Sequence, residues 1–317
     1  FSTTQRNGVT PILEIALFEY GNSRNSRQSG YVRMLNGFTR ELDAVSQGLF
    51  SLTTSGGNEY CGYAIKSAIE QLQWSQSDSD IKSIFIAGNE PFTQGPVNFR
   101  RAIALAKQRG VSINTIHAGD HDTGILGGWE AGARLAGGDY MSIDADQQIA
   151  HIVAPQDARI ADLNARLNQT YLPFGKRGEE KLERQASQDR ANAEIAPGLL
   201  SKRAISKSSS FYNNAGWDLV DGLAATDTPA QWLESIVEDE LPAPMLDMTS
   251  AERLQYIQKK AAERAEIKRD IDDLSRQRSD YIKEKQVEQA ATKPSMSDAL
   301  TRSVRKQALQ KNFSFDK

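Results

Sequence analysis

A short apolar run, Ser83–Ala87, constrains the fold of this chain more than any other stretch. Its centre is Ile-Phe-Ile, so both faces of the expected strand are apolar. Strands of that kind are typical of parallel α/β sheets, which helices cover on both sides. The polar turn Gly88–Pro91 ends the run, and open α/β sheets bind ligands at the carboxyl ends of their strands. Asn89 or Glu90 is therefore expected near any site in this protein.

Strand and helix patterns alternate through the first half of the chain. Strands are expected at residues 12–20, 31–35, 83–87, 111–116 and 140–143, and helices at 39–49, 63–73, 97–108 and 128–136. This order predicts an α/β fold with a mainly parallel, doubly wound sheet.

The second half of the chain is more polar and predicts a mostly α-helical extension. Helical patterns cover residues 156–167, 179–195, 249–289 and 296–309, whereas the Lys/Ser-rich stretch 201–210 is expected to be flexible. We therefore expect an α/β domain at 1–152, a helical or irregular extension at 153–243 and a charged long-helix segment at 244–317. The long helix carries one thin apolar stripe: Leu254, Ile257, Ala261, Ile271 and Leu274. Such a stripe favours packing on its own chain, or on a second chain as a coiled coil or oligomer.

Composition excludes several classes of function. The net charge is −3 and the pI about 5.8, so nucleic acid is a poor partner, and the basic patch Lys202–Lys207 is too short to change that. Cys61 is the only cysteine, which excludes an internal disulfide. No apolar run has the length of about 18 residues that a transmembrane helix needs. The chain begins at Phe1 without a methionine, so we expect a processed product or a fragment.

Residues of the types used in catalysis and metal binding are expected at the carboxyl edge of the sheet. Glu59 lies in a glycine-rich loop, and a short polar cluster, His117 and Asp120 to Asp122, follows another strand. One enzyme hypothesis pairs the Cys61 thiol with His117, and a second is a metal-assisted hydrolase built on Glu59, Asn89 and Asp120. Each competes with the simpler interpretation of solvated loops and a buried cysteine.

Several stretches together resemble the von Willebrand factor type A (vWA) domain over residues 11–144. They are Ile-Ala-Leu-Phe-Glu-Tyr at 15–20, Gly-Gly-Asn-Glu at 56–59, Ile-Phe-Ile-Ala-Gly-Asn-Glu-Pro at 84–91, Arg-Gly-Val-Ser-Ile-Asn-Thr-Ile at 109–116 and Leu-Ala-Gly-Gly-Asp-Tyr at 135–140. The resemblance implies a metal-ion-dependent adhesion site, in which three loops hold Mg²⁺. The first loop, Asp-x-Ser-x-Ser, is absent from this chain. Glu59 (or Asn58) stands where the family has a threonine, and Asn89 stands where it has an aspartate.

We therefore expect a protein-binding module and not an enzyme, with Mg²⁺ as a cofactor only if the first loop exists upstream. The expected partner-binding residues are Asn58, Glu59, Asn89, Glu90, His117 and Asp120, of which Glu59 and Asn89 would be the metal ligands. The resemblance also implies a bacterial envelope, cell-surface, periplasmic or secreted protein. A structural assembly subunit is the remaining alternative.

The vWA layout further implies a strand between residues 12–20 and 83–87. This chain lacks a pattern for it, so we expect upstream residues or another chain to supply it. Direct pairing of the two flanking strands would contradict that expectation.

Overall fold

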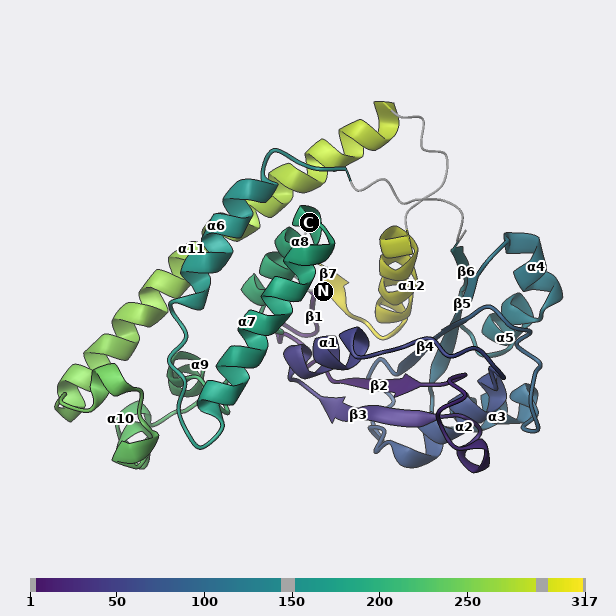
Figure 1. The fold of residues 1–317 in the computed structure, drawn as a ribbon, viewed down its shortest axis with the longest axis horizontal. Helices are drawn as coiled ribbons and strands as arrows, with labels where there is room; N and C mark the ends of the chain where they lie inside the picture. Colours follow the sequence, from purple (N-terminus) through teal and green to yellow (C-terminus); the bar gives the residue numbers. More distant parts are fainter. Residues whose placement is uncertain (1–3, 144–151, 289–295, 316–317) are drawn as a thin grey trace.

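The computed structural model describes residues 4–143, 152–288 and 296–315. The sheet part contains β1 (Thr4–Gln5), β2 (Ile15–Glu19), β3 (Arg33–Thr39), α1 (Leu42–Phe50), α2 (Cys61–Gln71), β4 (Ser83–Gly88), α3 (Phe99–Gln108), β5 (Ser112–Ala118), α4 (His121–Leu126), α5 (Trp129–Leu135) and β6 (Tyr140–Ile143). Then follow α6 (Asp157–Asn168), α7 (Gly178–Ile195), α8 (Pro197–Ser208), α9 (Leu219–Ala224), α10 (Pro229–Glu234), α11 (Ser250–Glu288), α12 (Met296–Gln310) and β7 (Ser314–Phe315). The mixed α/β architecture expected from the sequence is confirmed (Figure 1).

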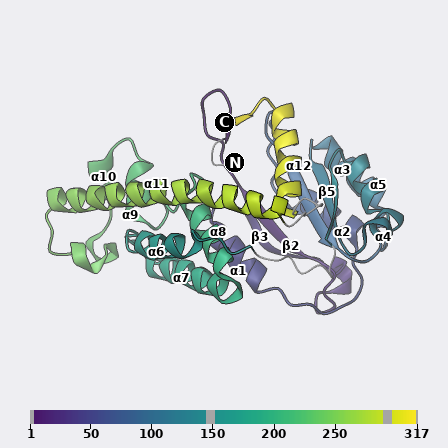
Figure 2. The same cartoon turned by 90° about the horizontal axis from the view of Figure 1, so that it is seen from above.

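The strands β4, β5 and β6 form a parallel sheet in that order. Phe85 lies opposite Asn114, and Thr115 opposite Tyr140. One face of this sheet is buried under α2, α3 and α5, with Ile86 in that core. Helices α3 and α5 lie on one side of the sheet and α12 on the other (Figure 2).

The strands do not form the single doubly wound sheet that the sequence pattern predicts. In the described part of the chain, β2 pairs only with β3, in antiparallel orientation, and β4 pairs only with β5. Leu17 lies opposite Asn36 rather than opposite any residue of β4. Direct pairing of β2 with β4 is therefore not observed, and the strand expected between them stays a prediction.

Helix α12 packs on the face of the parallel sheet that α2 and α3 leave free. The Asn114 side-chain oxygen accepts hydrogen bonds from Ser303 Oγ at 2.7 Å and from Gln307 Nε2 at 3.2 Å. The two ends of the chain also meet, because β1 and β7 pair in antiparallel orientation. The expected segment 244–317 thus contributes α11 to the helical part, which comprises α6 to α11, and α12 to the sheet part.

The long helix α11 packs along its apolar stripe on the helices that precede it, as the spacing predicts. Ile271 joins a core with Leu163 and Leu167 of α6, and Ile257 joins a second core that includes Leu219 of α9. Leu254, Ala261 and Leu274 are partly buried against these cores. This stripe is therefore used within the chain, and an oligomer through α11 stays a prediction. No helix in the described ranges is both long and apolar enough to cross a membrane.

The expectation of a flexible Lys/Ser-rich stretch at 201–210 is wrong. Most of it belongs to α8, and its Lys207 side chain is completely buried. The error has a physical cause, since a lysine is buried only where a specific partner compensates its charge, and that partner lies elsewhere in the sequence.

Candidate functional site

The structure brings part of the predicted cluster together at the carboxyl edge of the sheet. Glu59 Oε2 accepts hydrogen bonds from the backbone nitrogen atoms of Asn89, at 2.9 Å, and Glu90, at 3.1 Å. Gly88 lies opposite His117 in the parallel ladder. A β-carbon at residue 88 would lie 2.3 Å from Glu59 Oε2, so only glycine permits this approach.

The same contacts give Glu59 a role that the sequence does not reveal. One of its carboxylate oxygens holds the turn after β4, and its backbone nitrogen donates to Gln94 Oε1 at 2.7 Å. Asn58 and Asn89 are exposed, and the Glu90 carbonyl accepts from Trp129 Nε1 at 2.9 Å. Within the described ranges, no group of three or more His, Cys, Asp or Glu side chains is arranged to hold a metal ion. Metal ligation by Glu59 and Asn89 stays a prediction.

The polar cluster after β5 does not form the loop expected from its glycine content, because helix α4 begins at His121. Asp120 is the N-cap of this helix, and its Oδ1 accepts from Thr123 N at 2.9 Å. The hydrogen bonds from Thr123 lower the pKa of Asp120. His117 is buried beside Gly124, whereas His121 is exposed and lies 3.2 Å from Ser142 Oγ. The two histidines therefore lie in different surroundings.

Cys61 lies in the core at the start of α2, and its polar neighbour is a tyrosine. Its Sγ lies 3.6 Å from Tyr20 Oη, and its side chain is completely buried. Burial raises the pKa of the Cys61 thiol to about 12, although the Tyr20 hydrogen bond opposes this. A protonated thiol is a poor nucleophile, so these surroundings do not favour the Cys61 enzyme hypothesis.

We predict that Cys61 resists alkylation in the folded protein. A rise in the thiol pKa from 9.0 to about 12 lowers the thiolate fraction about 1,000-fold at mildly alkaline pH. Iodoacetamide incorporation, followed by mass spectrometry, should be negligible until guanidinium chloride unfolds the chain. Rapid modification before unfolding would instead restore the nucleophile hypothesis.

The edge of β4 that faces β2 carries backbone groups that no strand in the described ranges pairs. Ser112 N donates to the Lys82 carbonyl, so the backbone groups of residues 82, 84, 86 and 88 turn toward β5. Those of Ser83, Phe85 and Ala87 alternate with them and point away from β5. We call these three residues the open edge.

Tyr20, at the end of β2, is a side chain that reaches the open edge. Its Oη donates to the Ala87 carbonyl oxygen at 2.6 Å. The Tyr20 side chain therefore bridges the distance between the end of β2 and the end of β4. Strands that pair directly would lie only about 4.8 Å apart. Phe85 is 40 % exposed although it is in a strand that the sequence predicts to be buried on both faces. The open edge thus combines backbone groups without a strand partner with exposed apolar surface.

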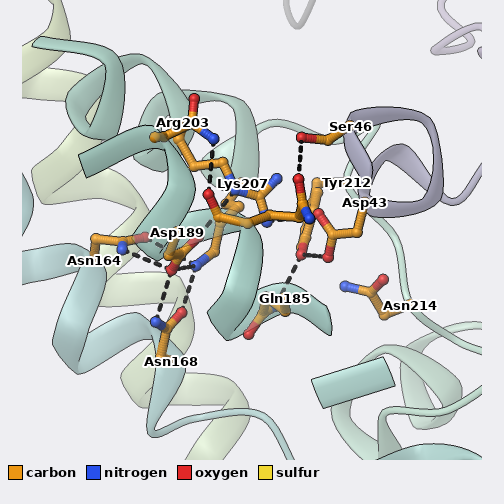
Figure 3. Close-up of polar contacts among 12 residues, drawn as sticks. Asp43, Ser46, Asn164, Asn168, Gln185, Asp189, Arg203, Lys207, Tyr212 and Asn214 are labelled. Carbon is orange, nitrogen blue, oxygen red and sulfur yellow. Dashed lines mark hydrogen bonds and ion pairs between the residues drawn. The ribbon is translucent and has the colours of Figure 1, made fainter. Parts of the chain in front are cut away.

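A second polar feature, a buried ion-pair network, joins the two parts of the molecule (Figure 3). Arg203 bridges two carboxylates, with Nη2 2.6 Å from Asp43 Oδ1 and Nε 2.9 Å from Asp189 Oδ1. Asp189 Oδ2 also lies 2.8 Å from Lys207 Nζ. Tyr212 Oη donates to Asp43 Oδ2 at 2.5 Å. Because Asp43 belongs to α1 and the other charges to α7 and α8, the network fixes α1 against the helical part.

The opposite charges in this network offset the effect of burial on one another's pKa values. Burial raises the pKa of Asp189, but Lys207 and Arg203 outweigh it and hold that pKa below its usual value. Burial lowers the pKa of Lys207 to about 8, although Asp189 opposes the change. The sequence gives one signal for this network, the four-residue spacing of Arg203 and Lys207, which places both cations on one helix face.

No protein-family model, curated protein or solved structure matches this chain.

Proposed function

We propose that this protein is a vWA-like protein-binding module that binds an extended segment of a partner polypeptide along the open edge, between β4 and β2. The observation that carries the proposal is that β2 and β4 do not pair with each other. In the vWA layout, which the sequence resembles, these two strands flank one further strand. An added strand binds mainly through main-chain hydrogen bonds, and the backbone groups of Ser83, Phe85 and Ala87 offer these.

The chemistry of the edge also specifies the kind of segment. A strand between β4 and β2 would contact the exposed Phe85 on one face and the core that contains Phe18 and Cys61 on the other. The partner segment therefore carries apolar residues on both faces, as buried strands do. The exposed loops at the carboxyl edge, with Asn58, Asn89 and Asp120, would then contact the residues that follow this segment.

The test uses a strand-forming probe peptide, acetylated and amidated Lys-Val-Thr-Val-Ile-Val-Thr-Lys. We expect binding, measured by titration, that is lost when proline replaces the central valine of the peptide, because proline cannot donate a main-chain hydrogen bond. Phe85→Asp should weaken binding at least about tenfold, because it places a charge against the apolar segment.

The matched control is Leu126→Asp on α4. Leu126 is 88 % exposed and lies outside the open edge, so its variant should bind the peptide as the unmodified chain does. Equal loss in both variants, or binding of the proline peptide as tightly as the original, would contradict the proposal.

A further inference from the structure

We infer that Tyr20 acts as a latch on the open edge, which a partner strand must displace from the Ala87 carbonyl before it pairs along the whole edge. The inference rests on the proposed function, since a latch has meaning only if a segment binds there. Its basis is the 2.6 Å hydrogen bond from Tyr20 Oη to the Ala87 carbonyl oxygen. That oxygen is one of the groups that a paired strand would use.

The position of Tyr20 in the chain explains why its side chain is available for this contact. Tyr20 follows the last residue of β2, and with Ala16 and Phe18 it packs on the core beneath α2. The ring is thus anchored on one face while the hydroxyl group reaches across to β4. A β-carbon at residue 88 would lie 2.6 Å from Tyr20 Oη, so the glycine at this position allows the hydroxyl to enter.

The second neighbour of the hydroxyl group holds it only weakly. This neighbour is Cys61 Sγ at 3.6 Å, and a thiol is a weak hydrogen-bond partner. Burial raises the pKa of Tyr20 well above its usual value, and Cys61 adds to the rise, so the hydroxyl remains a donor at neutral pH. A partner main-chain N–H can therefore replace the tyrosine hydroxyl at the Ala87 carbonyl. The partner is therefore a segment without proline at the residue opposite Ala87, because proline has no main-chain N–H to donate.

The experiment compares Tyr20→Phe with the unmodified chain in the titration with the Lys-Val-Thr-Val-Ile-Val-Thr-Lys peptide. Removing the hydroxyl frees the Ala87 carbonyl but keeps the ring in the core. We expect the dissociation constant to fall about fivefold, the factor that one neutral hydrogen bond contributes. Thermal unfolding of both chains verifies that the variant folds.

Tyr63→Phe is the matched control, because Tyr63 Oη also donates to a backbone carbonyl, that of Gln28 at 3.0 Å, away from β4. It should leave the dissociation constant unchanged. Equal binding by Tyr20→Phe and the unmodified chain would overturn the latch alone. No binding by either would overturn the latch together with the proposed function, whereas tighter binding by Tyr20→Phe only supports both.

Discussion

Replacing Asp189 with alanine is expected to lower the free energy of unfolding by about 3–5 kcal/mol, the cost of removing one partner from a buried ion pair. The substitution leaves Lys207, which is completely buried, with amide oxygens as its remaining partners. It also removes one of the two carboxylates that Arg203 bridges. Urea unfolding at neutral pH, followed by circular dichroism, measures the loss.

The pH dependence of this loss has a definite sign. Because the pKa of Asp189 in the folded protein lies below its unfolded value of about 3.8, the carboxylate stabilises the fold above that pH. The stabilisation disappears as the pH falls through the folded pKa. The difference between Asp189→Ala and the unmodified chain should therefore be full at neutral pH and shrink in acid.

Glu194→Ala on the same helix is the control for Asp189→Ala. Glu194 is exposed, and no ion pair to it is found among the described residues, so its loss should change the free energy of unfolding by no more than about 0.5 kcal/mol. Similar losses in both variants would mean that the buried network does not hold α1 against the helical part.

Arg264→Ala should destabilise the helical part by a similar amount, about 3–5 kcal/mol. Arg264 Nη1 lies 2.6 Å from Asp218 Oδ2, and Nη2 donates to the Thr170 carbonyl at 2.7 Å. The guanidinium also lies 4.0 Å from the centre of the Tyr171 ring. Asp218 is completely buried, so the substitution leaves its carboxylate without the cation that compensates it.

A second substitution distinguishes the effect of the uncompensated Asp218 carboxylate from the effect of lost packing. Adding Asp218→Asn to Arg264→Ala removes the uncompensated carboxylate, so the double variant should lose less than the sum of the two single variants. Arg269→Ala, an exposed residue on the same helix, controls for removing an arginine from α11. Strict additivity, or an equal effect of Arg269→Ala, would refute this role of Arg264.

Local patterns predicted the elements of this fold better than their assembly. The run at 83–87 is a strand and the apolar stripe of α11 packs as expected, because both signals depend on side chains within one element. The helix α8 was not predicted, because its burial depends on contacts that are distant in sequence. Arg203 of α8, for example, lies 2.6 Å from Asp43 of α1.

The same contrast between local elements and their assembly applies to the candidate site. Parallel strands place their carboxyl ends at one edge, so the proximity of Gly88, which ends β4, and His117, which lies in β5, could be predicted. That Glu59 accepts from backbone nitrogen atoms depends on the shape of the turn, which residue identities do not specify. The start of α4 was predictable in principle, since Asp120 and Thr123 have the spacing of an N-cap and its hydrogen-bond donor.

The amide hydrogen exchange of Phe85, compared with that of Asn114, tests the open edge most directly. The two residues lie opposite each other in the β4–β5 ladder, but the Phe85 N–H points away from β5. We predict rapid exchange at Phe85 and slow exchange at Asn114 in the free chain, with the probe peptide slowing exchange at Phe85 only. Equal protection of both amides in the free chain, unchanged by the peptide, would contradict the open edge, because it would mean that another strand already pairs with β4 on this side.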